Sequence, residues 1–411
     1  MSIHLKPAPI KVKFFTPIVV LLSVLAVNGL LFLAGRFIFG IGAVTNLDNQ
    51  HPWGIWIGLD VALGVALAAG GFTTAALGHI MHREKYEVII RPALLTAMLG
   101  YTFVASSVLI DIGRWYSIWH PLVFWNGNSA LFEVGICVMI YLTVLYIEFL
   151  PVVCERFIGR VNLPGILKKL NKPVDNLLRV LDRTLSRTMF IFIIAGVVLS
   201  CLHQSSLGTL MIIAGEKMHP LWQTPVLPML FLLSAISVGF PMVIFESIIS
   251  TKSFKLKPET EVLSGLARFI SPILGIYLAA KIIDMLIRGT YIYLTEFSIE
   301  SVMFSVELLL GVAVPLKLFM SEYVRKSPEG LFIASSLVIF GVFMNRLNNF
   351  VIAYNPPYSQ TTYFPSFGEI SVTIGFVAME VLIYRLCVMI FPVISCEEII
   401  IKQKTKFTVR G

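Results

Sequence analysis

Long apolar runs are the feature of this sequence that most restricts its fold. Charged residues make up only 14% of the 411 residues, against about a quarter in soluble proteins, and the mean hydropathy is +0.84. Charges and Pro or Gly clusters divide the chain into apolar runs of about 20 residues, the length that crosses a bilayer as a helix. The sequence therefore predicts an all-α integral membrane protein with about ten transmembrane helices. They begin near Thr16, Gly54, Pro92, Ser129, Thr188, Val226, Phe269, Glu300, Gly330 and Gly368.

Lys and Arg are unevenly divided between the loops on the two sides of the membrane. Most of the 32 basic residues lie in one set of loops, including the run 156–187 and the tail from Lys402. Because cytoplasmic loops carry the excess of positive charge, we expect both termini to be cytoplasmic and the protein to reside in the cell membrane. This orientation accounts for the net charge of +8 and indicates no nucleic-acid partner. The opposite loops and helix ends hold only Arg36, Arg114, Lys217 and Arg288.

Cysteine and histidine usage restricts the cofactors. The 5 cysteines are scattered without a Cys-x-x-Cys pair, which argues against an iron–sulfur cluster in this chain and against a disulfide framework. Of the 7 histidines only His79 and His203 fall within predicted helices, at opposite depths, so they cannot ligate one iron. We therefore expect no haem and no metal site. The loop 157–187 resembles an amphipathic surface helix, and the tail from Lys402 a solvated basic end.

Polar residues gather near the side of the membrane opposite the basic loops. The run Leu202–Ser206, LHQSS, interrupts an otherwise apolar helix. Counting about 1.5 Å per residue along each helix places four ionisable residues from four successive helices in one outer layer. Hydrocarbon penalises each unpaired polar group, so the layer is either a structural network or a site for a lipophilic molecule that exchanges protons, most obviously a quinone. The four residues are Asp60, Asp111, Glu133 and His203, with Arg114 just above them.

Buried charges also occur in the second half of the chain. Lys281 and Asp284 are three residues apart on one predicted helix and are expected to neutralise each other. Because intramembrane charges also occur in secondary transporters and proton channels, that class is the alternative to a quinone-reactive protein. Pairing between helices is expected for the rest: Glu307, Lys317, Arg346, Glu380 and Arg385.

Several motifs occur together along the chain: HPWGIWIGLD (51–60), RPALLTAMLGYTF (91–103), DIGRWY (111–116), SALFEVGICVMIYL (129–142), LHQSSLGTLMI (202–212), HPLWQ (219–223) and GEISVTIGFVAME (368–380). Together they resemble the NrfD/PsrC family of membrane quinone-interacting subunits, with the nearest likeness to the membrane subunits of Hyb-type nickel–iron hydrogenases. The likeness covers most of the chain.

This resemblance implies an architecture and a function. It implies two four-helix bundles, from helices two to five and six to nine, with the first and last helices at their flanks. The corresponding segments are 1–53 (anchor helix and external loop), 54–214, 215–354 and 355–411 (last helix and tail). The implied function is electron exchange between an extracytoplasmic ferredoxin-like iron–sulfur subunit and the menaquinone or ubiquinone pool, with coupled proton transfer and no haem. The parent complex would be a hydrogenase or a sulfur-metabolism complex with further redox subunits.

The resemblance also suggests roles for individual residues. The quinone head group is expected among Trp53, Gly54, Asp111, His203 and Gln204, with His203 as the first choice for hydrogen bonding and proton exchange. An interfacial aromatic belt explains the tryptophans equally well. The mouth would be lined by Arg114, His219 and Trp222. The catalytic candidates are His203, Asp111, Glu133 and Asp60, and a proton path is expected along Glu133, Tyr141, Glu148 and Glu246.

Overall fold

The computed structural model describes residues 7–80, 86–257 and 259–395. Within these ranges it contains 10 helical segments long and apolar enough to cross a membrane and no β-strand, which confirms the predicted all-α membrane protein. His82, Cys396 and the tail from Lys402 lie outside the described residues.

The spans alternate in direction along the chain. Those of the first half are α1 (Pro17–Phe39); the series η2 (Trp56–Val61), α2 (Ala62–Leu67), α3 (Ala69–Ala75) and η3 (Ala76–Ile80); α4 (Glu87–Asp111); α6 (Ala130–Phe157); and α7 (Asn171–Ala214). Those of the second half are α8 (Leu227–Phe254); α9 (Thr260–Ala267) with α10 (Ile270–Arg288); α11 (Ile299–Leu308) with η9 (Leu309–Ala313) and α12 (Val314–Met320); α14 (Pro328–Leu347) with η10 (Asn348–Ile352); and α15 (Phe367–Ile390). Short helices α5 (His120–Val123) and α13 (Glu322–Lys326) lie in the connections.

Helix starts follow from local sequence signals. The Thr16 hydroxyl accepts a hydrogen bond from the Val19 amide, and Pro17 occupies the first turn of α1. At α15, Ser366 and Glu369 bond each other's backbone amides in a capping box. Such caps satisfy amides that have no partner within the helix, a need that is strong where water is absent.

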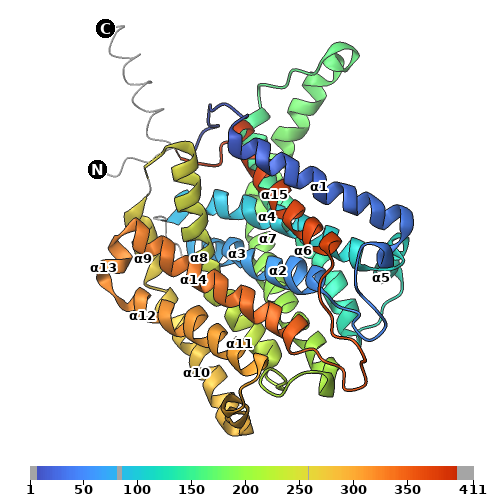
Figure 1. Cartoon of the computed structure of the whole chain (residues 1–411). Coiled ribbons are helices and arrows are strands. Elements are labelled where there is room, and N and C mark those ends of the chain that lie inside the picture. The colour runs from blue at the N-terminus through green and yellow to red at the C-terminus, as the bar shows by residue number, and fades with distance from the viewer. Residues whose placement is uncertain (1–6, 81–85, 258, 396–411) are drawn as a thin grey trace.

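Helix α7 is longer than the sequence predicted. The expected span began near Thr188, with a separate surface helix before it, but one helix runs through both, and its first part projects beyond the other helices in Figure 1. No Pro or Gly lies between Val174 and Ala195, so nothing in the sequence interrupts the helix there. The seventh span likewise starts before Phe269, because α9 precedes α10.

Glycines allow some spans to approach closely. Helices α1 and α15 lie side by side (Figure 1), and a Cβ atom on Gly29 would lie 2.8 Å from Gly375 Cα. Gly311 in η9 and Gly341 in α14 meet backbone to backbone in the same way. Small residues at crossings are the usual way in which transmembrane helices gain packing contacts.

Two groups of spans form the body of the molecule. In the first bundle α2, α3, α4, α6 and α7 pack together, and in the second α8, α10, α12 and α14 do so. Helix α8 also contacts α2, α3 and α7, so it joins the bundles. We call the side bearing loops 158–170 and 255–257 the basic face, and the side bearing loops 40–55, 112–129, 215–226 and 353–366 the aromatic face. On the aromatic face the two bundles also meet through a backbone bridge between Met218 and Tyr354.

Candidate functional site

His203 is buried in the first bundle with one ring nitrogen unpaired. It lies on α7 with 0% of its surface exposed, and its Nδ1 is 3.3 Å from the Tyr101 hydroxyl of α4. Its Nε2 has no hydrogen-bond partner. A buried polar atom without a partner costs about 1–3 kcal/mol, so this nitrogen is a candidate for ligand binding.

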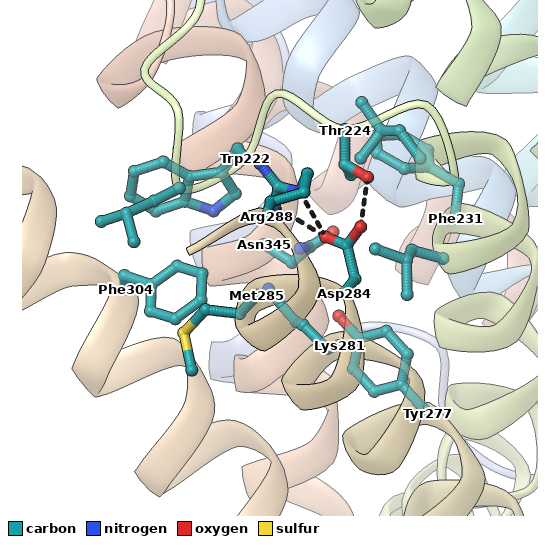
Figure 2. Close-up of a pocket in the computed structure, with 13 residues that line it drawn as sticks. Trp222, Thr224, Phe231, Tyr277, Lys281, Asp284, Met285, Arg288, Phe304 and Asn345 are labelled. Carbon is teal, nitrogen blue, oxygen red and sulfur yellow. Dashed lines mark hydrogen bonds and ion pairs between the residues drawn. The ribbon is translucent and has the colours of Figure 1, made fainter. Parts of the chain in front are cut away.

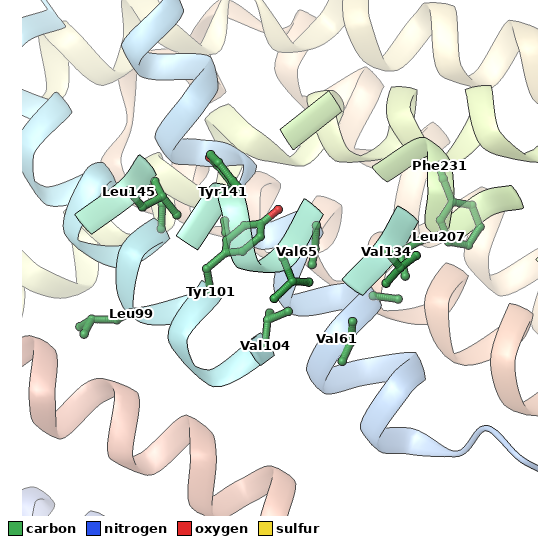
Figure 3. Close-up of a cluster of buried hydrophobic side chains, with 14 of the residues drawn as sticks. Val61, Val65, Leu99, Tyr101, Val104, Val134, Tyr141, Leu145, Leu207 and Phe231 are labelled. Atoms are coloured by element: carbon green, nitrogen blue, oxygen red, sulfur yellow. The ribbon is translucent and has the colours of Figure 1, made fainter. Parts of the chain in front are cut away.

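A series of polar side chains continues from Tyr101 along the bundle. The Tyr101 and Tyr141 rings meet edge to face with centroids 4.4 Å apart, and Figure 3 shows them together among apolar side chains. Ser200, one turn before His203, lies near both phenols, and neither its Oγ nor the Tyr141 hydroxyl has a hydrogen-bond partner. Farther toward the basic face, Glu148 interacts with Tyr141 and packs against Gly196. Tyr141 and Glu148, both predicted for the proton path, therefore follow His203 and Tyr101 in one row of neighbouring polar side chains.

Gln204 is also fully buried and is half satisfied. Its Oε1 accepts a hydrogen bond from Arg346 Nη2 at 3.5 Å, whereas its Nε2 has no partner. Two consecutive residues of α7 thus each carry a buried side-chain nitrogen without a partner.

Asp60 and Asp111 form a separate acid cluster. Asp60 accepts a hydrogen bond from Thr373 at 3.0 Å and interacts with Asp111. The positive charge beside Asp111 is Arg36 of α1, which donates to the carbonyls of Ile110 and Ile112, each at 2.6 Å. The predicted single outer layer is therefore divided: the two aspartates lie with Arg36 between α1, α4 and α15, and His203 lies with Tyr101.

Glu133 and Arg114 are exposed and lie outside both groups. Arg114 does not cap the layer, since the adjacent turn ends α4 and turns its side chain outward, and Arg36 takes the place beside Asp111. Glu133 lies in the first turn of α6 on the exposed side of that helix.

Trp53 and Gly54 lie at the aromatic face. The half-buried Trp53 packs on Tyr354 with ring centroids 5.8 Å apart. Gly54 abuts the hydroxyl of Tyr363, which donates to Glu369 at 2.5 Å. Burial, followed by this bond to Glu369, raises the pKa of Tyr363. A side chain at position 54 would collide with this pair, which explains the glycine.

Trp222 and His219 belong to the second bundle. The buried Trp222 indole donates to Glu307 Oε2 at 3.0 Å. His219 packs against Tyr293 with ring centroids 5.2 Å apart, and partial burial lowers its pKa. Both residues, predicted to line the mouth of the quinone site, thus make these contacts with residues of the second half of the chain.

The second bundle holds an ion pair between Lys281 of α10 and Glu307 of α11. Asn345 and Asn348 also donate to Glu307, at 2.8 and 2.7 Å. Asp284 binds Arg288 at 2.7 Å and Thr224 at 2.7 Å (Figure 2). The expectation that Lys281 and Asp284 neutralise each other is therefore wrong, because each has a better placed partner on another turn or element.

Glu246 lies near the basic face. It lies near Thr96 and Tyr384 and lines a cavity of about 50 Å³, large enough for water, together with Ser250 and Lys257. The contacts that involve Glu246 are distinct from those of Glu148.

Among the described residues no group of three His, Cys, Asp or Glu side chains is placed to hold a metal ion. Cys137, Cys154, Cys201 and Cys387 are free thiols.

Sequence reasoning missed Tyr101, Arg36 and Ser200. Tyr101 lies within the motif RPALLTAMLGYTF, but a tyrosine in an apolar run carries no signal that it faces a histidine. Arg36 was visible as a lone charge at the end of an apolar helix, which marks a residue in need of a partner.

Comparison with known proteins agrees with this architecture. The family model described as "Polysulphide reductase, NrfD" matches residues 43–355. A protein of Nitratidesulfovibrio vulgaris is 38% identical over 93% of this chain and 95% of its own. The "Probable Ni/Fe-hydrogenase 2 b-type cytochrome subunit" of Escherichia coli is 32% identical over 94% and 95%. The "Menaquinone reductase, integral membrane subunit" of N. vulgaris is 26% identical over 87% of each chain.

The fold and these matches define a multi-pass membrane subunit of the kind found in quinone-linked oxidoreductases. The chain belongs to the NrfD family, as its motifs predicted. Its relatives are membrane subunits of redox enzymes, which supports the predicted role as a redox subunit.

Proposed function

We propose that this chain binds quinone beside His203 and Gln204 and exchanges electrons between the quinone pool and an extracytoplasmic ferredoxin-like iron–sulfur subunit. The observation that carries the proposal is the pair of buried side-chain nitrogens without partners, His203 Nε2 and Gln204 Nε2. Quinone carbonyl oxygens accept hydrogen bonds, and both side chains can donate one from these atoms. The menaquinone reductase relative supports the choice of substrate.

Proton transfer accompanies the electrons in this proposal. Reduction of one quinone to quinol takes two electrons, delivered by the partner subunit, and two protons. When the Tyr101 hydroxyl donates to Nδ1, the neutral His203 ring carries its hydrogen on Nε2 and can pass it to a quinone oxygen. Tyr101 then passes its hydroxyl proton to Nδ1, which keeps the ring neutral, and Tyr141, Ser200 and Glu148 can reprotonate Tyr101. Once the ring again carries its hydrogen on Nε2, the same transfers deliver the second proton, and quinol oxidation runs them in reverse.

Other predicted residues keep narrower roles. Asp60 and Asp111 are proposed to hold protons near the aromatic face, where the iron–sulfur partner docks. Trp53 and Gly54 are proposed to form part of the aromatic face beside the quinone site. His219 and Trp222 contact the second bundle and are given no role in quinone binding. Glu246, with its own cavity, is proposed as a water-accessible acid at the basic face. Glu133, being exposed, is left out of the path, and Arg114, also exposed, is left out of the quinone site.

The loop charges support an orientation. The basic face is proposed to be cytoplasmic and the aromatic face extracytoplasmic, in the cell membrane, with both termini on the cytoplasmic side. Either a hydrogenase or a sulfur-metabolism complex fits this arrangement as the parent complex. Copurification with a four-cluster ferredoxin-like protein is expected, and its absence from a gently solubilised complex would reject the proposed partner.

Binding of a fluorescent hydroxyquinoline N-oxide, a quinol analogue, tests the site. We expect wild type and the control His120→Ala, an exposed residue of the short helix α5, to bind it equally, and His203→Ala to bind about tenfold more weakly, the effect of losing about 1.4 kcal/mol. Equal binding by His203→Ala would reject His203 as a quinone ligand. No binding by any variant, including wild type, would reject the quinone site.

A further inference from the structure

Arg346 is a fully buried arginine at the junction of the two bundles, with 0% of its surface exposed. It lies on α14 of the second bundle, and its guanidinium stacks on the Phe231 ring, 3.8 Å from the ring centroid. Every nitrogen of the guanidinium has a partner. Nη1 donates to Asn345 Oδ1 (2.5 Å), Nε to Ala62 O (3.3 Å), and Nη2 to Ser234 Oγ (2.9 Å), Phe231 O (3.2 Å) and Gln204 Oε1 (3.5 Å).

The contact with Gln204 determines how its amide is oriented. A guanidinium has only donors, so the amide must turn its oxygen toward Arg346. The amide nitrogen then points away from Arg346, and it is the Gln204 atom that has no partner. Without Arg346, the amide could rotate by half a turn and place its oxygen where the nitrogen now lies.

The second bundle in turn holds Arg346 in place. Asn345 accepts from Arg346 through Oδ1 and donates to Glu307 through Nδ2 at 2.8 Å. Glu307 is fixed by its ion pair with Lys281. A continuous set of contacts therefore runs from Lys281 through Glu307, Asn345 and Arg346 to Gln204.

We propose that Arg346 is a positioning residue for the quinone site: it fixes the Gln204 amide so that Nε2 donates to a quinone oxygen. The inference rests on the proposed function. A rotated amide would set its oxygen against the quinone oxygen, and two acceptors in contact repel each other. The residue acts through Gln204 and does not itself touch the quinone.

Lysine cannot replace arginine in this role. A lysine ammonium keeps the charge, but it is a single point donor on a flexible stem and cannot reach Asn345, Ser234 and Gln204 in a fixed plane. Arg346→Lys therefore separates the buried charge from the planar positioning of the amide.

A double-mutant cycle tests the inference in the assembled membrane complex. The variants are Arg346→Met, Gln204→Ala and their combination, and the probe is the hydroxyquinoline N-oxide. We expect each single variant to weaken binding about tenfold and the double variant to bind no more weakly than Gln204→Ala alone. The control Arg385→Met removes an arginine near the basic face, whose guanidinium donates to Lys13 O, and should bind as wild type does.

Each other outcome rejects the inference in a recognisable way. If the two effects multiply in the double variant, Arg346 acts independently of Gln204, while the quinone site stands. If Gln204→Ala binds as wild type does, neither Gln204 nor its positioning matters, and the His203→Ala result decides separately whether quinone binds there. If Arg346→Met does not accumulate, Arg346→Lys takes its place. It is expected to weaken binding several-fold in the wild-type background and not in the Gln204→Ala background, and equal losses in both would reject the inference.

Discussion

The Glu307 carboxylate of the second bundle and the neighbouring residues His203 and Gln204 of the first differ in how fully their buried polar atoms are bonded. In the second bundle the carboxylate of Glu307 binds Lys281, Trp222, Asn345 and Asn348, so both of its oxygens are satisfied. In the first bundle His203 and Gln204 each keep an unpaired nitrogen at similar burial. Leaving such an atom unpaired costs about 1–3 kcal/mol, so two consecutive residues that each do so indicate a binding role, whereas the fully bonded Glu307 carboxylate marks a structural centre. Whether a buried polar atom has a partner therefore distinguishes a structural network from a ligand site better than the presence of buried charge does.

Breaking the satisfied network should have the largest effect. Glu307→Leu leaves Lys281 charged and unpaired, and removing one partner of a buried ion pair costs about 3–5 kcal/mol. We expect little folded protein, measured by size-exclusion chromatography of the solubilised chain after a heating series. The double variant Lys281→Met with Glu307→Leu should recover much of the loss. A single variant that melts as wild type does would contradict the structural role of the pair.

Changing the unsatisfied site should affect turnover and leave folding intact. His203→Gln keeps a side-chain N–H but cannot exchange a proton, so kcat with quinone should fall about 100-fold, the lower end of general acid–base contributions. The KM should stay within about threefold, since one hydrogen bond is retained. Steady-state kinetics on the assembled complex measure both. An unchanged kcat would remove His203 from proton transfer.

The tyrosine beside His203 should have a smaller effect. Tyr101→Phe keeps the ring and removes the hydroxyl, and losing about 1 kcal/mol of hydrogen bonding predicts a turnover decrease of about fivefold. Tyr146→Phe is the matched control, because its hydroxyl also bonds α4, at Thr102 (2.9 Å), on the exposed side. Equal rates in the two variants would show that the Tyr101 hydroxyl does not serve His203.

The smallest effect is expected at the far end of the polar series. Glu148→Gln should slow proton uptake from the basic face about threefold, because bridging waters can replace part of a side-chain route. The control is Glu155→Gln, a half-exposed carboxylate of the same helix that pairs with Arg91. A pH-sensitive dye outside and inside proteoliposomes measures the rate on each side. Undiminished uptake in Glu148→Gln would remove this residue from the route.

The sequence predicted the fold well because membrane helices depend mainly on apolar length. It also drew attention to His203 and Gln204, since polar residues in an apolar run stand out, and their role as quinone ligands stays a prediction. It could not predict partners from distant segments. Asp111 lies beside Arg36 of the first helix, and Lys281 pairs with Glu307 and not with its near neighbour Asp284. Spacing shows which residues share a helix face, but which neighbouring helix that face meets depends on packing.

The length of α7 has a mechanical consequence for the site. With 44 residues at about 1.5 Å each the helix is about 66 Å long, roughly twice the hydrocarbon thickness of a bilayer. Its amphipathic beginning at the basic face and the residues His203 and Gln204 are parts of one uninterrupted rod. Because no Pro or Gly breaks the helix between Val174 and Ala195, the part that projects from the bundle and the part that carries His203 belong to one continuous element.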